Sequence, residues 1–302
     1  MAGSRSLARL EATLAVVFWG ASFIATKIAL REVSPETVVW IRFLMGTVVL
    51  GIAMLTRGEG ALPSRRDLAY FALLGFIGIT FHQWLQSTGL VTAQASTTAW
   101  IVATTPIFIA ILGWLFLKEY LGKWGVFGIG LATFGVLLVV SQGDHTSLRL
   151  GDFGTPGDIL ILISAVNWAV FSILSRRGLQ THPAMRMLFY VMAFGWIFSS
   201  ILFFARAGLW EISNLSRSGW FSIGFLGIFC SGLGYIFWYD ALNIIPTSQV
   251  GAFLYIEPIV AVLVAAAILG EPVLLASLFG GVIILVGVWL VNRSGGSERM
   301  TS

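Results

Sequence analysis

The sequence predicts an all-α polytopic membrane protein with ten transmembrane helices in two inverted five-helix repeats. Two observations lead to this fold class, an apolar composition and an internal repeat. Of the 302 residues, 57% are hydrophobic and only 11% are charged. Because a soluble globular protein usually carries about 25% charged residues, this composition is typical of a chain surrounded by lipid.

The internal repeat has an offset of 152 residues. Its reference stretch is 253–271, which is almost entirely apolar yet contains Glu257 and ends at Glu271. A carboxylate inside an apolar helix is costly in lipid, so it is kept only where it faces protein or water. The pairs that match at this offset without a gap include Gly75 with Gly227, Leu90 with Leu242, Ser96 with Ser248, Pro106 with Pro258, Glu119 with Glu271 and Gly135 with Gly287.

Five spans are expected in the first half, since each needs roughly 20 mostly apolar residues. They are predicted at residues 10–30, 36–56, 68–88, 93–117 and 121–141. The first is expected to be a retained span, because its apolar run continues to Leu30 without the cleavage site of a signal peptide. Turn or charge signals separate the others, at Ser34-Pro35, 57–66, Thr92 and 118–123.

Five further spans are predicted at residues 157–177, 184–206, 218–240, 247–269 and 273–292. The breaks between them are short, so neighbouring helices must form antiparallel hairpins. The chain is therefore divided into a first five-helix repeat (1–145), a second five-helix repeat (155–293) and a polar C-terminal tail (294–302).

Lys and Arg residues are unequally distributed between the two sides of the predicted bundle. One side holds only Arg31, Arg149, Arg206 and Arg217. The other side holds Arg5, Arg9, Arg57, Arg65, Arg66, Lys118, Lys123, Arg176, Arg177, Arg186, Arg293 and Arg299. Because loops rich in Lys and Arg stay in the cytoplasm, both termini are predicted to be cytoplasmic. The net charge of +4 thus indicates membrane orientation and not nucleic-acid binding.

Each half has an odd number of spans, so the second half begins on the opposite side and is inverted relative to the first. The first spans align at a slightly different offset of 149, which pairs Trp19 with Trp168 and Lys27 with Arg176. Inverted repeats are typical of transporters, in which two equivalent half-structures exchange around a site at the middle of the membrane.

The sequence lacks the motifs that are typical of several classes of protein function. Gly122-Lys123 has neither the upstream glycine nor the following hydroxyl of a phosphate-binding loop. Three histidines and the single Cys230 are too few and too scattered for a metal site, and one cysteine allows no intrachain disulfide. The sequence predicts no catalytic residue, no metal and no cofactor, so any transport is driven by a gradient or is facilitated diffusion.

The chain resembles the EamA-type members of the drug/metabolite transporter superfamily. The resemblance rests on W-G-A-S-F at 19–23, I-R-F at 41–43, an acidic residue closing the fourth span of each half, the internal prolines and the glycine-rich fifth spans. It implies a multi-pass transporter of the bacterial-type cytoplasmic (inner) membrane and not an enzyme. Within this family the chain looks most like the bacterial exporters of aromatic amino acids, which implies alternating access through a central cavity between spans one to four and six to nine.

Tryptophans inside the spans are the first candidates for lining such a cavity. Trp19 and Trp168 lie near the middle of their spans and not at the headgroup level, where tryptophan usually collects. Trp100 is also inside a span. Aromatic walls offer stacking and apolar area to a substrate with a ring, and a face for an ammonium group. The alternative is plain packing between helices.

Polar side chains inside the third span are the second group of candidates. His82 and Gln86 share a helix face, and Gln83 lies beside them. They cannot face lipid without cost, so they contact either a substrate or another helix. Asn167 beside Trp168 is a further candidate. In the second half Gly234 and Tyr235 replace the histidine, which would give a cavity the asymmetry that a substrate needs.

Charged residues inside the spans form the third group. Lys27 and Arg42 lie toward the outer ends of their spans and could attract the carboxylate of an amino acid. They could equally snorkel, or be neutralised by Glu257 or Glu32. Glu257 is the expected partner of Lys27, and it could instead bind the ammonium group of a substrate or a proton.

Pro106 and Pro258 lie at matched positions inside the fourth span of each half. Each removes a backbone donor and kinks its helix, so both spans are predicted to be bent. The bends could serve as hinges or be static.

Alternatives stay open at this point. The same fold could carry a drug, a nucleobase or a sugar phosphate, although a phosphorylated cargo would need more cations than Lys27 and Arg42. A polytopic membrane enzyme would need a carboxylate pair, for which the spans offer only Glu257 and Asp240. The expected partners are a small-molecule substrate and the lipid bilayer, and the sequence does not specify the driving ion, the direction of flux or the oligomeric state.

Overall fold

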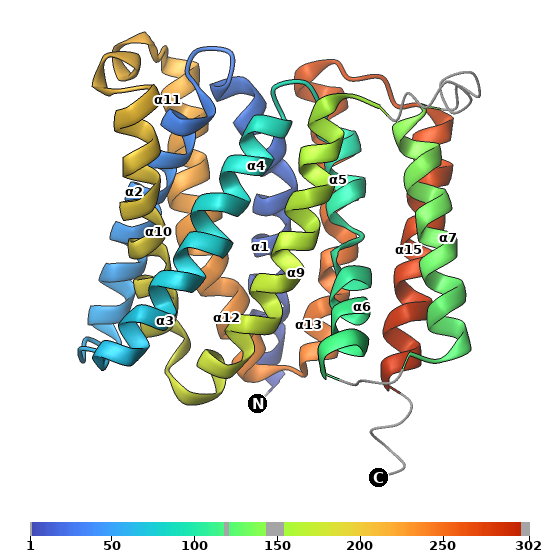
Figure 1. Cartoon of the computed structure of the whole chain (residues 1–302), viewed down its shortest axis with the longest axis horizontal. Helices are drawn as coiled ribbons and strands as arrows, with labels where there is room; N and C mark the ends of the chain where they lie inside the picture. The colour runs from blue at the N-terminus through green and yellow to red at the C-terminus, as the bar shows by residue number, and fades with distance from the viewer. Residues whose placement is uncertain (1, 118–120, 143–153, 297–302) are drawn as a thin grey trace.

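The computed structural model describes residues 2–117, 121–142 and 154–296. Within these ranges the chain has no strand, and ten helical stretches are long and apolar enough to cross a membrane. Figure 1 shows them side by side in one bundle, with both chain termini at the same end. We call this the terminal end and the other the opposite end. The residues Lys118, Glu119, Arg149 and Arg299 used above lie outside the described ranges.

Each predicted span corresponds to one helical stretch. The first half consists of α1 (Ala2–Ala29), α2 (Pro35–Thr56), α3 (Arg65–Gly75), η1 (Phe76–Phe81), α4 (His82–Gly89), α5 (Ala95–Val102), α6 (Thr105–Leu117) and α7 (Lys123–Val140). The break predicted at Ser34-Pro35 is a helix start, where the Ser34 hydroxyl accepts a hydrogen bond from the backbone N–H of Thr37.

The second half consists of α9 (Pro156–Thr181), α10 (Ala184–Arg206), η2 (Leu209–Asn214), α11 (Arg217–Gly224), η3 (Phe225–Leu233), α12 (Gly234–Ile244), α13 (Thr247–Phe253), η4 (Leu254–Ile256), α14 (Glu257–Val264), η5 (Ala265–Leu269) and α15 (Leu275–Gly296). Helix α1 begins at the terminal end, whereas α9 begins at the opposite end (Figure 1). The second half is therefore inverted, as the odd number of spans predicts.

Spans three and eight contain π-helical segments at matched positions. Segment η1 ends directly before His82, and η3 ends directly before its repeat counterpart Gly234. In each case the first span of the other half bonds a backbone carbonyl of the segment. The amide of Asn167 donates to Ile77 O at 2.8 Å, and the indole of Trp19 donates to Cys230 O at 3.1 Å. The two halves thus satisfy each other's irregular backbone, a requirement inside a membrane.

Spans four and nine are interrupted directly before their prolines. In span four α5 ends at Val102 and α6 begins at Thr105, one residue before Pro106. In span nine the 3-10 segment η4 separates α13 from α14, which begins one residue before Pro258. Because proline lacks an N–H and its ring crowds the preceding turn, both interruptions follow from the sequence.

Spans five and ten pack closely through glycines. A Cβ at Gly128 in α7 would lie 2.6 Å from the carbonyl oxygen of Gly287 in α15, and a Cβ at Gly135 would lie 2.7 Å from that of Gly280. Only glycine permits this approach of two helix backbones. The glycine-rich fifth spans therefore contact each other within the chain.

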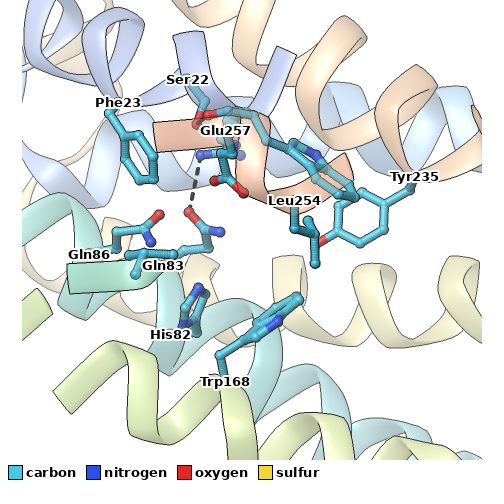
Figure 2. Close-up of a pocket in the computed structure, with 12 residues that line it drawn as sticks. Ser22, Phe23, His82, Gln83, Gln86, Trp168, Tyr235, Leu254 and Glu257 are labelled. Carbon is cyan, nitrogen blue, oxygen red and sulfur yellow. Dashed lines mark hydrogen bonds between the residues drawn. The ribbon is translucent and has the colours of Figure 1, made fainter. Parts of the chain in front are cut away.

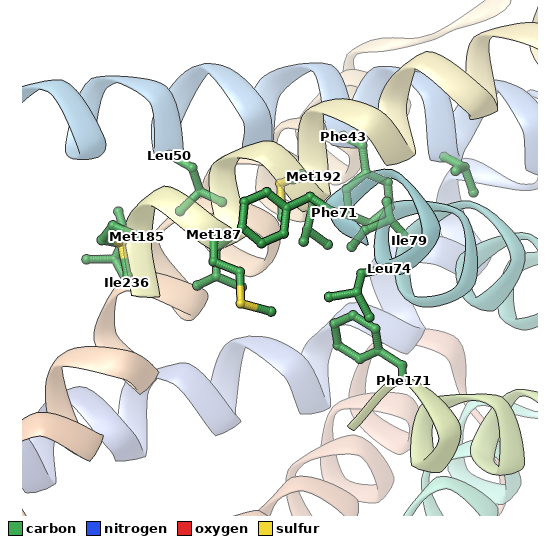
Figure 3. Packing of buried hydrophobic residues seen from close by; sticks show 13 residues of the cluster. Phe43, Leu50, Phe71, Leu74, Ile79, Phe171, Met185, Met187, Met192 and Ile236 are labelled. Atoms are coloured by element: carbon green, nitrogen blue, oxygen red, sulfur yellow. The ribbon is translucent and has the colours of Figure 1, made fainter. Parts of the chain in front are cut away.

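A large apolar cluster holds the spans of the two halves together (Figure 3). It combines Phe43 and Leu50 of α2 with Phe71 of α3 and with Met187 and Met192 of α10, all at most 1% exposed. This packing fixes α2 and the third span, which supply part of the site described below.

Candidate functional site

A cavity of about 120 Å³ lies within the bundle, where α1, α2, α4, α9, α12 and α14 meet (Figure 2). One water molecule needs only about 10–15 Å³ on the same scale, so the cavity is large enough for several waters or a small molecule. Its lining combines aromatic rings, amides and two oppositely charged side chains. The lining residues are Trp19, Ser22, Phe23, Arg42, His82, Gln83, Gln86, Val102, Trp168, Tyr235, Leu254 and Glu257.

A second cavity of about 140 Å³ lies between the two interrupted spans. It shares Val102, Trp168, Leu254 and Glu257 with the first cavity, so the two adjoin. Its remaining lining residues are Ala99, Ala103, Thr105, Pro106, Ile109, Gly251, Tyr255, Pro258 and Asn292. Because both prolines line it, a change in either bend would change the shape of this cavity.

Arg42 brings a positive charge into the first cavity. Its side chain is only 5% exposed. Its Nε–H donates to the Ser231 hydroxyl at 2.7 Å, and an Nη1–H donates to Oε1 of Gln83 at 3.0 Å. In the described ranges no carboxylate lies within 4 Å of its guanidinium. The cavity therefore contains a cation whose charge no neighbouring acid neutralises directly.

Glu257 brings a negative charge into both cavities. In the part of the chain that the structure describes, its carboxylate has no hydrogen-bond donor and no cation within 4 Å. Figure 2 shows its side chain pointing into the same space as Gln83 and His82. Gly20 permits this arrangement, because a Cβ there would lie 2.6 Å from the Glu257 carbonyl oxygen. The glycine of the W-G-A-S-F motif thus lets α1 lie directly against the start of α14.

Aromatic rings form two walls of the cavity. The ring centroids of His82 and Trp168 are 4.7 Å apart, and those of Trp19 and Tyr235 are 5.6 Å apart. The Trp19 ring is fixed by its hydrogen bond to Cys230 O. Rings held at these distances form rigid apolar surfaces with polar edges.

His82 also offers one ring nitrogen to the cavity. Its Nδ1 lies 3.1 Å from the carbonyl oxygen of Ser164, which can only accept a hydrogen bond. Nδ1 must therefore carry the proton, and in the neutral ring Nε2 is then an acceptor. This nitrogen can receive an N–H or O–H from a bound molecule.

The structure brings together most of the residues that the sequence suggested. His82, Gln83, Gln86, Trp168, Trp19, Tyr235, Arg42 and Glu257 line the first cavity, and Pro106 and Pro258 line the second. Sequence reasoning missed Ser22, Phe23, Val102 and Leu254. The signal for the first two was available, because Ser22 and Phe23 follow Trp19 by three and four residues and so share its helix face.

Three suggested residues lie elsewhere. Trp100 is 3% exposed and packs on Gly281 of α15. Asn167 uses its amide to bond Ile77 O in η1. Lys27 donates to Ala93 O at 2.6 Å, and its Nζ lies 3.8 Å from Glu271. None of the three lines either cavity, and the expected pairing of Lys27 with Glu257 is replaced by pairing with Glu271.

The residues described here include no cluster of three or more His, Cys, Asp or Glu side chains that could hold a metal ion. The lining of the first cavity contains groups that can recognise a small polar molecule. It offers a guanidinium, a carboxylate, two amides and an imidazole nitrogen within aromatic walls.

Comparisons with known proteins follow the same division into halves. The profile of the EamA-like transporter family matches residues 8–141 and 155–293. The uncharacterized transporter YyaM of Bacillus subtilis is 29% identical over 273 residues, which covers 90% of this chain and 89% of the relative. A probable terminal-alkyne amino-acid exporter of Streptantibioticus cattleyicolor is 28% identical over 280 residues, covering 93% and 91%. A solved crystal structure with 21% identity and a TM-score of 0.67 covers 98% of this chain and shares its fold.

Proposed function

Because the chain belongs to the EamA-like transporter family, we propose that it exports aromatic and other small neutral amino acids by alternating access through the central cavity. The single observation that carries this proposal is the pair of opposite charges, Arg42 and Glu257, in one aromatic-walled cavity. Neither has a direct ionic partner among the residues that the structure describes. One relative is named as a probable amino-acid exporter, which supports the same substrate class.

Arg42 is the group that would hold the substrate carboxylate. A guanidinium has five N–H donors, and only two of those of Arg42 are used, by Ser231 and Gln83. The remaining donors can form the paired hydrogen bonds that carboxylates make with arginine. The bonds already formed hold the guanidinium in place, so little side-chain entropy is lost when a substrate binds.

The aromatic walls would hold the substrate side chain. Trp168 and Trp19 present indole surfaces, and Phe23 adds a third ring. Burying an apolar side chain contributes about 25 cal/mol for each Å² removed from water, so larger neutral side chains are expected to bind more tightly. The charged side chain of a basic or acidic amino acid would find no further partner here.

The charged residues at the ends of the bundle support the proposed location and orientation. Lys123, Arg57, Arg65 and Arg186 begin or end helices at the terminal end, and the positive-inside rule then supports a cytoplasmic location for this end. We infer a multi-pass protein of a bacterial-type inner membrane with both termini cytoplasmic. The second cavity includes Asn292, close to the end of α15 at this side.

The test is uptake of labelled phenylalanine, tryptophan, threonine and methionine into proteoliposomes that contain the purified protein. Saturable flux with competition among the four amino acids is expected. His82→Ala and Trp168→Ala should raise the half-saturation constant, whereas Trp124→Ala, at a 68% exposed position away from the cavity, should not. Folded protein without flux above empty liposomes would overturn the amino-acid assignment and direct the search to nucleobases, drugs and sugar phosphates.

A further inference from the structure

The carboxylate of Glu257 lies inside the bundle, where an unpaired charge is unfavourable, and helix packing alone does not explain why it is there. It lies inside the bundle at the first residue of α14, and within the described ranges nothing donates a hydrogen bond to it or pairs with it. An ionised carboxylate without a partner at membrane depth is strongly unfavourable. It is therefore stable only with a bound proton or beside a cation that enters the cavity.

The groups that face Glu257 do not provide that cation. The titratable or charged side chains near it from neighbouring elements are Arg42, His82, Cys230, Tyr235 and Tyr255. Helices α1 and α9 contribute only Trp19, Ser22, Phe23 and Trp168 to the lining. Arg42 directs hydrogen bonds to Ser231 and Gln83, and His82 uses Nδ1 on Ser164 O.

We propose that Glu257 binds the substrate ammonium group and a proton in turn, so that the protein is a proton/amino-acid antiporter. This inference rests on the amino-acid export proposed above. A zwitterion fits both charges at once, with its carboxylate on Arg42 and its ammonium group on Glu257. Each side chain that lacked an ionic partner then has one, and each charge of the substrate is compensated.

The exchange is balanced in protons and charge. When a zwitterion enters from the cytoplasm, the Glu257 carboxyl group releases its proton to that side and the ammonium group takes its place. When the substrate leaves on the other side, the carboxylate takes up a proton there and carries it back. One proton and one positive charge therefore enter for each amino acid exported, so both a pH gradient and an inside-negative potential drive export.

This assignment also restricts the substrate. An N-acetylated amino acid has no ammonium group to replace the proton, and an amine without a carboxyl group leaves Arg42 unpaired. Both are expected to compete poorly with phenylalanine, whereas neutral α-amino acids with different apolar side chains compete well.

The test uses proteoliposomes loaded with a pH-sensitive dye and given a gradient of labelled phenylalanine. The parent protein is expected to move protons against the amino acid, and an imposed pH gradient should drive accumulation of phenylalanine. Competition between proton and ammonium group makes the half-saturation constant rise as pH falls, approaching about tenfold per pH unit on the acid side.

Two variants separate this role from a structural one. Glu257→Gln should lose proton movement, accumulation and the pH dependence of the half-saturation constant. Any remaining exchange of labelled for unlabelled phenylalanine should need a higher phenylalanine concentration, because the ammonium group has lost its partner. Glu36→Gln removes a carboxylate that lies outside the cavity near Trp84 and Arg206, and should keep all three properties. The pH dependence of the parent needs no variant and is informative even if Glu257→Gln fails to fold.

The outcomes are distinguishable. Phenylalanine flux in the parent without proton movement, and with a half-saturation constant independent of pH, would overturn the antiport mechanism and leave amino-acid export standing. Absence of phenylalanine flux would overturn both. Proton-coupled flux that Glu257→Gln retains would show that another group carries the proton.

Discussion

The carboxylate of Glu271 accepts two hydrogen bonds from Ser96, one from its backbone N–H at 3.0 Å and one from its hydroxyl at 2.7 Å. A third comes from the backbone N–H of Ala95 at 2.8 Å, and Lys27 lies 3.8 Å away. The first N–H groups of a helix have no intrahelical partner and carry partial positive charge. The end of span nine in one half thus caps the start of span four in the other and fastens the opposite end of the bundle.

Breaking this cap should open the opposite end. A hydrogen bond to a charged group contributes roughly 1.5–3 kcal/mol, and 1.4 kcal/mol changes a population ratio about tenfold. We therefore expect Glu271→Ala to raise the accessibility of the cavity from that end about tenfold or more. The measurement is the rate at which an impermeant thiol reagent labels Ser22→Cys in a Cys230→Ser background.

The matched control for this prediction is Glu32→Gln. Glu32 also accepts hydrogen bonds from a helix start at the same end, from the backbone N–H and hydroxyl of Ser216, but it does not join spans four and nine. Its labelling rate should equal that of the parent. Equal rates in Glu271→Ala and the parent would show that this cap does not hold the end closed.

The fold could be predicted from the sequence because its determinants are local or repeated. Apolar length gives the spans, the Ser34-Pro35 break gives a helix start, and matched prolines give matched interruptions at Pro106 and Pro258. The π-helical segments could not be predicted in this way. They depend on partners such as Asn167 and Trp19, which reach them from the other half of the chain.

The site could be predicted in part, because a polar side chain inside a transmembrane span must have a partner. This reasoning selected Arg42, His82 and Glu257, and all three line the first cavity. It could not identify the partner, so Lys27 was assigned to Glu257 although Glu271 is the acid that it meets. The sequence also does not show which side of a helix faces the cavity. Trp100, which was expected to line it, packs on a neighbouring helix instead.

Acid is expected to weaken the attachment of the loop that contains Glu211. This side chain is 8% exposed and accepts hydrogen bonds from Ser34 and Thr37 at the start of α2. Burial alone would raise the pKa of Glu211, but these hydrogen bonds lower it below its usual value. A lowered folded-state pKa means that the stabilisation is fully present above the unfolded pKa of about 4.3 and is lost as pH falls through the folded value.

Glu211→Gln should therefore lower the thermal midpoint at neutral pH, by a destabilisation of about 1–3 kcal/mol. The difference from the parent should shrink at the lowest pH that the folded protein tolerates, as the pH approaches the folded-state pKa and the parent carboxylate becomes protonated too. Thermal unfolding in detergent at both pH values measures this. Ser213→Ala, in the same segment with its hydroxyl on Trp210 O, should show no such convergence. A constant difference at the two pH values would rule out the ionised Glu211 as the cause.

Arg42→Lys should separate charge from geometry in substrate recognition. Lysine keeps the positive charge but loses the planar fork that matches a carboxylate, and it cannot bond Ser231, Gln83 and a substrate in the same arrangement. We expect the half-saturation constant for phenylalanine to rise about tenfold, a loss of about 1.4 kcal/mol. Weak competition by phenethylamine, which has no carboxylate, should stay unchanged. If both ligands weaken equally, Arg42 supports the cavity and does not hold the carboxylate.

Pro258→Ala tests whether the interruption of span nine is a hinge. Alanine restores a backbone N–H and removes the ring that crowds the preceding turn, so η4 and α14 can join into a straighter helix. We expect unchanged or higher thermal stability, with a maximal transport rate about tenfold lower because one of the two end states becomes strained. Pro272→Ala, in the loop before α15, is the control and should leave the rate unchanged. Normal expression with a normal rate in Pro258→Ala would show that the bend is static and that movement of span nine occurs elsewhere.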